Sequence, residues 1–145
     1  MSKEVMGFNI QGYATDPTHY ERIKEMTAFI IAHVEKGGSA DSAEDCERLT
    51  AYMRLRAAQT PLTGEMLLSA RDCFNLGDPG LFVMMALIQN DTMYGTRGEG
   101  ARLHNPGNVG DDDAGHTVDY GSWQTGVDAV AQWLDKHRCE SKTIT

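Results

Sequence analysis

Residues 81–88, LFVMMALI, form an uninterrupted apolar run in the middle of the chain. The run is much shorter than the roughly 20 apolar residues that cross a bilayer, so it belongs in a protein core. Its methionines and alanine favour a helix over a buried strand. Asp78 and Pro79, just before it, are typical of an N-cap and a first-turn proline. Because the run is apolar on every side, the sequence predicts a central helix surrounded by other helices and continuing to about Met93.

Four further helices are predicted around this one, each from apolar residues at helical spacing next to a start or stop signal. They are expected between Pro17 and Gly37, between Asp41 and Pro61, from Thr63 to about Phe74, and after Ser122. Asp41 and Glu44 form a capping box, and Ser122 is a favourable N-cap. Residues 1–15 are expected to be an irregular or extended lead-in, and residues 111–121, DDDAGHTVDYG, have room for a short β-hairpin. The predicted fold class is therefore mainly α.

The length and net charge of the chain limit the kinds of protein to which it can belong. A length of 145 residues suits a single domain, residues 1–145, that can bury a core without disulfides. The formal net charge of −8 argues against a surface that neutralises nucleic acid. It leaves open an acidic decoy that occupies a nucleic-acid-binding protein. The three cysteines form no CxxC pair and are expected to be free thiols in a reducing compartment.

The N-terminal residues MSKEVMGFNIQGY contain no apolar stretch of signal-peptide length, and no segment is long enough to span a membrane. Synthesis in the cytoplasm is therefore expected. An action at the cell wall would require delivery by something other than a signal peptide.

Asp91 is the strongest candidate for a catalytic group. It is expected in the last turn of the central helix, close to Tyr94 and to a turn at Gly95. The helix C-terminus carries partial negative charge, and apolar neighbours remove water, so both features favour the neutral carboxylic acid. A neutral acid is what a glycosidase needs to protonate the oxygen of a departing sugar.

A turn with the sequence NPGN follows at residues 105–108. Proline and glycine occupy the positions that a type II turn prefers, and Asn105 and Asn108 offer amide groups for sugar hydroxyls or N-acetyl carbonyls. Tyr94, and more weakly Tyr120, could stack on a sugar ring. No cofactor is implied.

The segments ALIQNDTMYGTRGEGARLHNPGNVG and YGSWQTGVDAVAQWL resemble the lysozyme-like glucosaminidase and lytic-transglycosylase domains of phage and prophage peptidoglycan hydrolases. The similarity covers residues 61–138 and leaves the N-terminal helices of residues 1–60 unmatched. It implies cleavage of the β-1,4 bond between amino sugars. Asp91 stands at the position of the catalytic acid, where the family usually has glutamate, and an acid shorter by one methylene can lose about a hundredfold in rate.

Other acidic residues are alternatives to Asp91. Glu99 is the second candidate acid, although a solvated loop would keep its pKa too low for that role. Residues 111–113, DDD, with His104 and His116 nearby, lack the spacing of a calcium or zinc site and are interpreted as a solvated acidic loop. That loop could still supply a second carboxylate that positions water in an inverting mechanism.

Besides the weaker decoy hypothesis, two functions from different classes remain. The first is a peptidoglycan-cleaving enzyme whose partner is the glycan strand or a chitin-like oligosaccharide. The second is a catalytically silent protein of the same fold that acts as a binding, assembly or inhibitor module, with the N-terminal helices contacting a protein partner.

Overall fold

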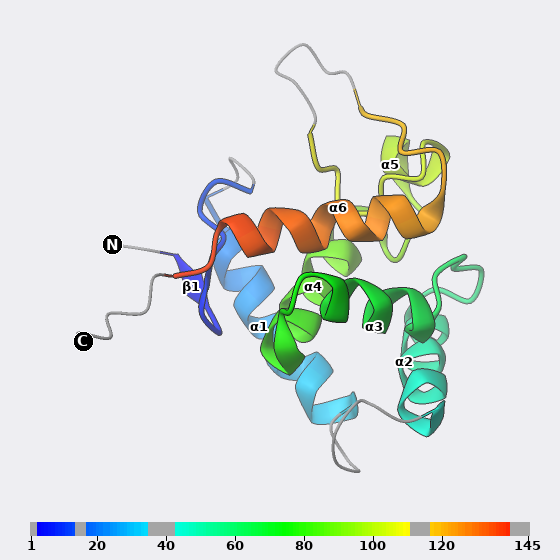
Figure 1. The fold of residues 1–145 in the computed structure, drawn as a ribbon, viewed down its shortest axis with the longest axis horizontal. Helices are drawn as coiled ribbons and strands as arrows, with labels where there is room; N and C mark the ends of the chain where they lie inside the picture. Colours follow the sequence, from blue (N-terminus) through cyan, green and yellow to red (C-terminus); the bar gives the residue numbers. More distant parts are fainter. Residues whose placement is uncertain (1–2, 14–16, 35–42, 111–116, 140–145) are drawn as a thin grey trace.

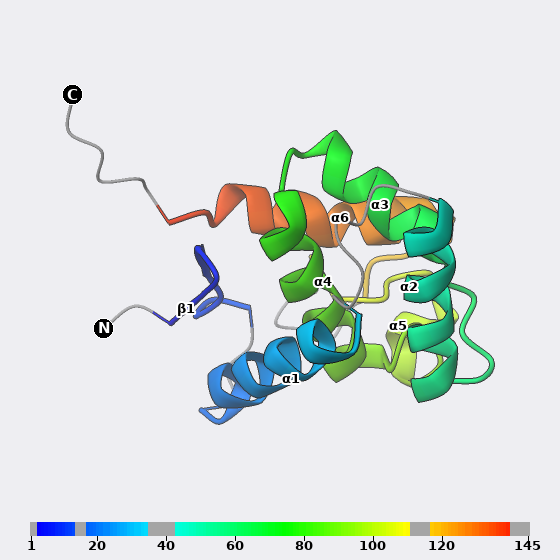
Figure 2. The ribbon, with the colours of Figure 1, turned by 90° about the horizontal axis from the view of Figure 1, so that it is seen from below.

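Helix α4, Gly77–Thr92, passes through the middle of the protein in the computed structural model, with α1 on one side and α3 on the other (Figure 1, Figure 2). The model describes residues 3–13, 17–34, 43–110 and 117–139. Every residue of α4 from Gly80 to Gln89 is buried. The predicted central helix is confirmed, and the fold is mainly α.

Five other helices surround or cap α4. They are α1 (His19–Val34), α2 (Ala43–Arg56), α3 (Gly64–Cys73), α5 (Gly98–Arg102) and α6 (Trp123–Lys136). Helices α1, α3, α5 and α6 pack against α4, and α2 packs mainly on α1 and α3. Residues on both sides of position 60 thus share one hydrophobic core.

Local capping explains where two helices begin. The Thr63 hydroxyl accepts a hydrogen bond from Met66 N at 3.3 Å, and the Ser122 hydroxyl accepts one from Thr125 N at 3.2 Å. Each bond satisfies a backbone donor that the first helical turn leaves open. The predicted starts of α3 and α6 are confirmed. The predicted capping residue Asp41 falls outside the described residues.

The start of α4 differs from the prediction. Leu76 is the N-cap residue and has no side-chain capping bond, whereas Asp78 lies inside the first turn. The Asp78 carboxylate accepts a 2.9 Å hydrogen bond from Nη1 of Arg71, a buried residue at the end of α3. An acidic side chain in the first turn still interacts favourably with the helix dipole.

The β-hairpin lies at a different place from the predicted one. Strands β1, Glu4–Val5, and β2, Phe8–Asn9, pair antiparallel within the segment predicted to be irregular or extended. Asn9 N donates to the His137 carbonyl and Cys139 N to the Gly7 carbonyl, both at 2.8 Å. The hairpin therefore joins the chain that follows α6. Residues 117–121 of the predicted hairpin contain no strand, and residues 111–116 are outside the described part.

Helix α5 was not predicted, because its five residues lie in a segment that its glycines mark as a loop. Within the described residues, none of the helices has the length and apolar character needed to span a membrane.

Candidate functional site

Asp91 occupies the last turn of α4, as its position after the apolar run predicted. The side chain is partly buried, and its Oδ2 atom is enclosed. Oδ1 accepts a 3.3 Å hydrogen bond from Nδ2 of Asn90. Beyond it, Met93 and Tyr94 both adopt the left-handed conformation, with φ of 47° and 55°, and end the helix.

The turn at residues 105–108 packs directly against this helix end. Thr92, the neighbour of Asp91, donates from its hydroxyl to the Pro106 carbonyl at 2.7 Å and accepts from Gly95 N at 2.9 Å. Thr92 is buried. One side chain thus connects the end of α4, the turn after it and the NPGN segment.

Asn105 is part of the protein interior and has no free group for a sugar. Its Nδ2 donates to the carbonyls of Val109 at 3.1 Å and Val118 at 3.0 Å, and its Oδ1 accepts from Val109 N at 2.9 Å. The residue is fully buried. These bonds use the side chain to hold the loop together, so the predicted ligand-binding role of Asn105 is corrected to a structural one.

Tyr94 is likewise fully buried, so its ring has no face for stacking on a sugar. Its hydroxyl donates to Oε1 of Gln89 at 3.0 Å, and the hydroxyl of Tyr52 on α2 donates to the same atom at 3.2 Å. Burial is the main reason that the pKa of Tyr94 lies well above its ordinary value of 10.0. The predicted substrate-binding role is therefore corrected: Tyr94 belongs to the core.

Asn108 lines a hollow of about 240 Å³. We call it the Tyr13 hollow; its other lining residues are Gly12, Tyr13, Val109, Gly110 and Trp133. The Tyr13 hydroxyl donates to the Gly107 carbonyl, and its ring packs edge-on against Trp133 at 4.7 Å between centroids. The N-terminal segment therefore covers part of the NPGN turn. Tyr13 carried no sequence signal because it lies far from the turn in the chain.

Tyr120 is partly buried beside this region. Its hydroxyl donates to the Val109 carbonyl at 3.0 Å, so it supports the loop. His104 lies 3.5 Å from Asp119, between Nδ1 and Oδ1. Within the described parts of the chain, no three potential metal ligands gather in one place. Residues 111–113 and His116 are outside those parts.

Glu99 lies on α5 with its side chain in solvent, paired with Arg102 at 2.6 Å between Oε2 and Nη2. The hydrogen bond from Arg102 lowers the pKa of Glu99, so this group is a carboxylate at neutral pH. Glu99 cannot hold a proton for a leaving group in this arrangement.

Glu99→Gln is therefore expected to leave any cell-wall clearing at the wild-type rate. Turbidity of purified cell walls measures this directly. A loss comparable to that of an Asp91 variant would make Glu99 the acid instead.

A second hollow, of about 350 Å³, opens between α1, α2 and α4. We call it the α1–α2–α4 hollow; its lining residues are Arg22, Glu25, Met26, Phe29, Arg56 and Gln89. Arg22 Nε donates to Asn90 Oδ1 at 3.2 Å, and Asn90 in turn donates to Asp91. The hollow is thus connected to the end of α4 by a short chain of hydrogen bonds.

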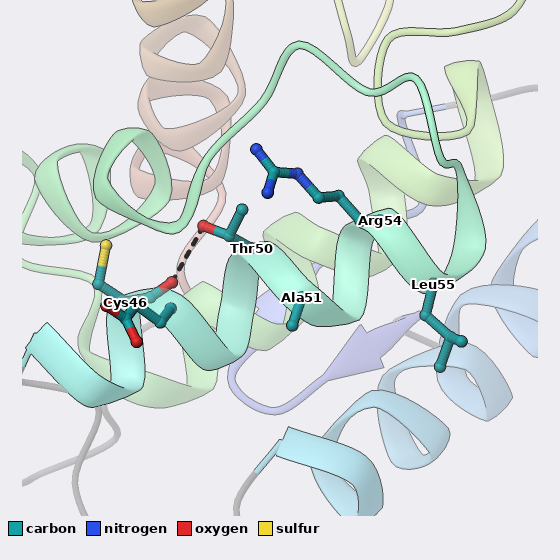
Figure 3. A pocket seen from close by; sticks show the side chains of 6 residues that line it. Cys46, Thr50, Ala51, Arg54 and Leu55 are labelled. Atoms are coloured by element: carbon teal, nitrogen blue, oxygen red, sulfur yellow. Dashed lines mark hydrogen bonds between the residues drawn. The ribbon is translucent and has the colours of Figure 1, made fainter.

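A third hollow, of about 500 Å³, follows α2 and is lined by Cys46, Glu47, Thr50, Ala51, Arg54 and Leu55 (Figure 3). Burial, with Glu65 and Glu47 nearby, raises the pKa of the Cys46 thiol. A thiol that keeps its proton is a poor nucleophile, so this hollow contains no activated cysteine.

The chain was also compared with known proteins. No known protein family matches it, and neither a curated protein nor a solved structure does. The chemistry of the residues around the end of α4 is therefore the basis for inferring a function.

Proposed function

We propose that the protein cleaves the glycan strand of peptidoglycan, with Asp91 as the general acid. Asp91 would protonate the oxygen of the departing amino sugar and then accept a proton from water or from the muramyl 6-hydroxyl. Asn108 and Tyr120 are the sugar-contacting candidates whose side chains are not fully buried. Tyr94, Asn105 and Thr92 would act as the scaffold that positions the acid.

The observation that carries this proposal is the position of Asp91. It is a partly buried carboxyl group at the C-terminal end of a helix that is buried for ten consecutive residues, Gly80 to Gln89. The helix dipole and the exclusion of water disfavour negative charge there, whereas the hydrogen bond from Asn90 favours it. A mainly α fold with a central helix that ends at an acid, followed by a packed NPGN turn, also agrees with the lysozyme-like resemblance.

The test compares the wild type with Asp91→Asn and Asp91→Glu on purified cell walls. Removal of the general acid is expected to lower the clearing rate by about a hundredfold or more. Asp91→Glu restores the side-chain length typical of the resembling family and is expected to retain or increase clearing.

Glu99→Gln serves as the matched control, since it removes an acid that is exposed and ion-paired. Mass spectrometry of the soluble products identifies the bond cleaved. A folded wild type that releases no fragments, or an Asp91→Asn variant that clears at the wild-type rate, would refute the enzymatic proposal.

The second candidate is a silent binding or inhibitor module. It is favoured by the contacts of the unmatched N-terminal region, since Tyr13 bonds to the NPGN turn and Arg22 bonds to Asn90. Through these contacts the N-terminal region occupies the space through which a sugar would have to reach Asp91. Co-sedimentation with cell walls, without clearing by the wild type or Asp91→Glu, would support this candidate.

A further inference from the structure

The α1–α2–α4 hollow combines an apolar wall with a cationic rim. Phe29 is 43% exposed although it is aromatic, and Met26 lies on the same helix. The Arg56 guanidinium lies over the Phe29 ring at 5.4 Å from its centroid. A volume of about 350 Å³ is at the small end of the range that ligand sites occupy.

Gln89 forms the polar part of this hollow. The residue is only 4% exposed, and its Oε1 atom is fixed by the hydroxyls of Tyr52 and Tyr94. Because both tyrosines donate to the oxygen, the amide nitrogen Nε2 is left as the donor on the other side of the group. Within the described residues, Nε2 has no acceptor, and Gln89 lines the hollow. Nε2 is not among the enclosed polar atoms that lack a partner, so an acceptor that enters the hollow can reach it.

The charges around the hollow favour an anion. Two arginines and one glutamate line it, although the whole chain has a formal net charge of −8. Arg22 already donates to Asn90 and to the Thr18 hydroxyl. Arg56, in contrast, makes no hydrogen bond to any described residue, and its guanidinium lies over the Phe29 ring. Its guanidinium donors are available for a carboxylate.

We propose that the α1–α2–α4 hollow binds a small ligand with a carboxylate group. The carboxylate oxygens accept hydrogen bonds from Gln89 Nε2 and from the Arg56 guanidinium, and the apolar part of the ligand packs on Met26 and Phe29. Acidic peptides have this chemistry whether they are free or attached to a glycan strand. The site does not require the proposed chemistry of Asp91.

The test is a calorimetric titration of the full chain with three probes. Muramyl dipeptide represents the cell-wall source and acetyl-alanyl-glutamate represents a free acidic peptide. The third probe is the same dipeptide with both carboxylates amidated. At least one of the two acidic probes should bind. The amidated peptide should bind at least about tenfold more weakly than the acidic probe that binds. Binding of muramyl dipeptide alone assigns the cell-wall source, and equal binding of the two acids assigns the shared acidic peptide.

Two variants remove the proposed donors. Gln89→Glu keeps an acceptor for both tyrosines but replaces the amide donor, and Arg56→Gln removes an exposed cation. Each is expected to weaken binding about tenfold. Arg54→Gln is the matched control, because Arg54 lies on the side of α2 that faces the segment joining α2 to α3 and lines the other hollow (Figure 3).

Thermal unfolding of each variant identifies any variant that misfolds. If Gln89→Glu misfolds, Arg56→Gln alone is enough to test the proposal. The proposal is overturned if neither acid binds, if the amidated peptide binds as tightly as the acid, or if Arg56→Gln weakens binding no more than Arg54→Gln. Lost binding with normal clearing of cell walls refutes this site alone. Normal binding without clearing refutes only the proposed enzymatic function.

Discussion

Tyr94→Ala is expected to reduce the free energy of unfolding by roughly 3–5 kcal/mol, the usual cost of removing a fully buried large aromatic side chain. The ring of Tyr94 is 0% exposed and packs edge-on against Tyr52, with 6.4 Å between ring centroids. The substitution leaves a cavity at the end of α4 and removes one hydrogen bond to Gln89. Urea denaturation followed by circular dichroism measures the change.

Tyr94→Phe separates the hydroxyl from the ring. It keeps the packing and should cost about 1 kcal/mol at neutral pH, the typical net value of one hydrogen bond. Since burial raises the pKa of Tyr94, its contribution to stability is present below the ordinary value of 10.0 and is lost as the pH rises above it. The phenylalanine variant should therefore lose less stability than the wild type above pH 10.0. If Tyr94→Ala instead leaves stability unchanged and weakens sugar binding, the residue is a stacking platform after all.

Gly126→Ala is expected to destabilise the protein by about 3 kcal/mol, at the upper end of the cost of overpacking. A Cβ atom at this position of α6 would lie 2.1 Å from the His104 carbonyl oxygen and 2.6 Å from Cδ of Pro106. Both atoms belong to the loop that contains the NPGN turn, and a backbone carbonyl cannot rotate away as a side chain can. The gain of about 1 kcal/mol that alanine brings to a helix interior is smaller than this clash.

Gly12→Ala is the control for this substitution, because no described atom lies within 4 Å of its added Cβ. A change within about 0.5 kcal/mol is expected there. Thermal or urea unfolding of both variants checks the difference. Equal stability of Gly126→Ala and the wild type would mean that α6 and the turn are not in close contact, and that Thr92 alone holds the turn to α4.

Several features of the fold followed from local chemistry that the sequence displays directly. The apolar run at residues 81–88 predicted a buried helix. A helix that is apolar on every side must be covered by protein on every side, and this follows from its composition alone. Thr63 and Ser122 predicted helix starts, because the capping bond spans only three residues. The hairpin at residues 4–9 was missed, since its strands are two residues long and it is joined to the distant chain around His137.

The roles of the polar residues around α4 could not be obtained in the same way. Tyr94 and Asn105 have side chains suited to sugars, but both are buried by segments distant in the sequence. Tyr52 lies 42 positions before Tyr94, and both tyrosines donate to Gln89. Val118 accepts from Asn105 across 13 positions. Burial depends on which distant segments pack together, and a local sequence pattern does not predict this packing.

The sequence by itself determined the class of this protein: a mainly α chain built on one central helix, with an acid at the end of that helix and an NPGN turn after it. Only the tertiary structure decided which polar groups are left for a ligand. In the folded protein Tyr94 and Asn105 are buried, and Tyr13 contacts the NPGN turn. Gln89 lines a hollow that three separate helices form. The physical reason is that capping and amphipathicity act within a few residues, whereas burial and hydrogen-bond partnership depend on contacts between residues far apart in the chain.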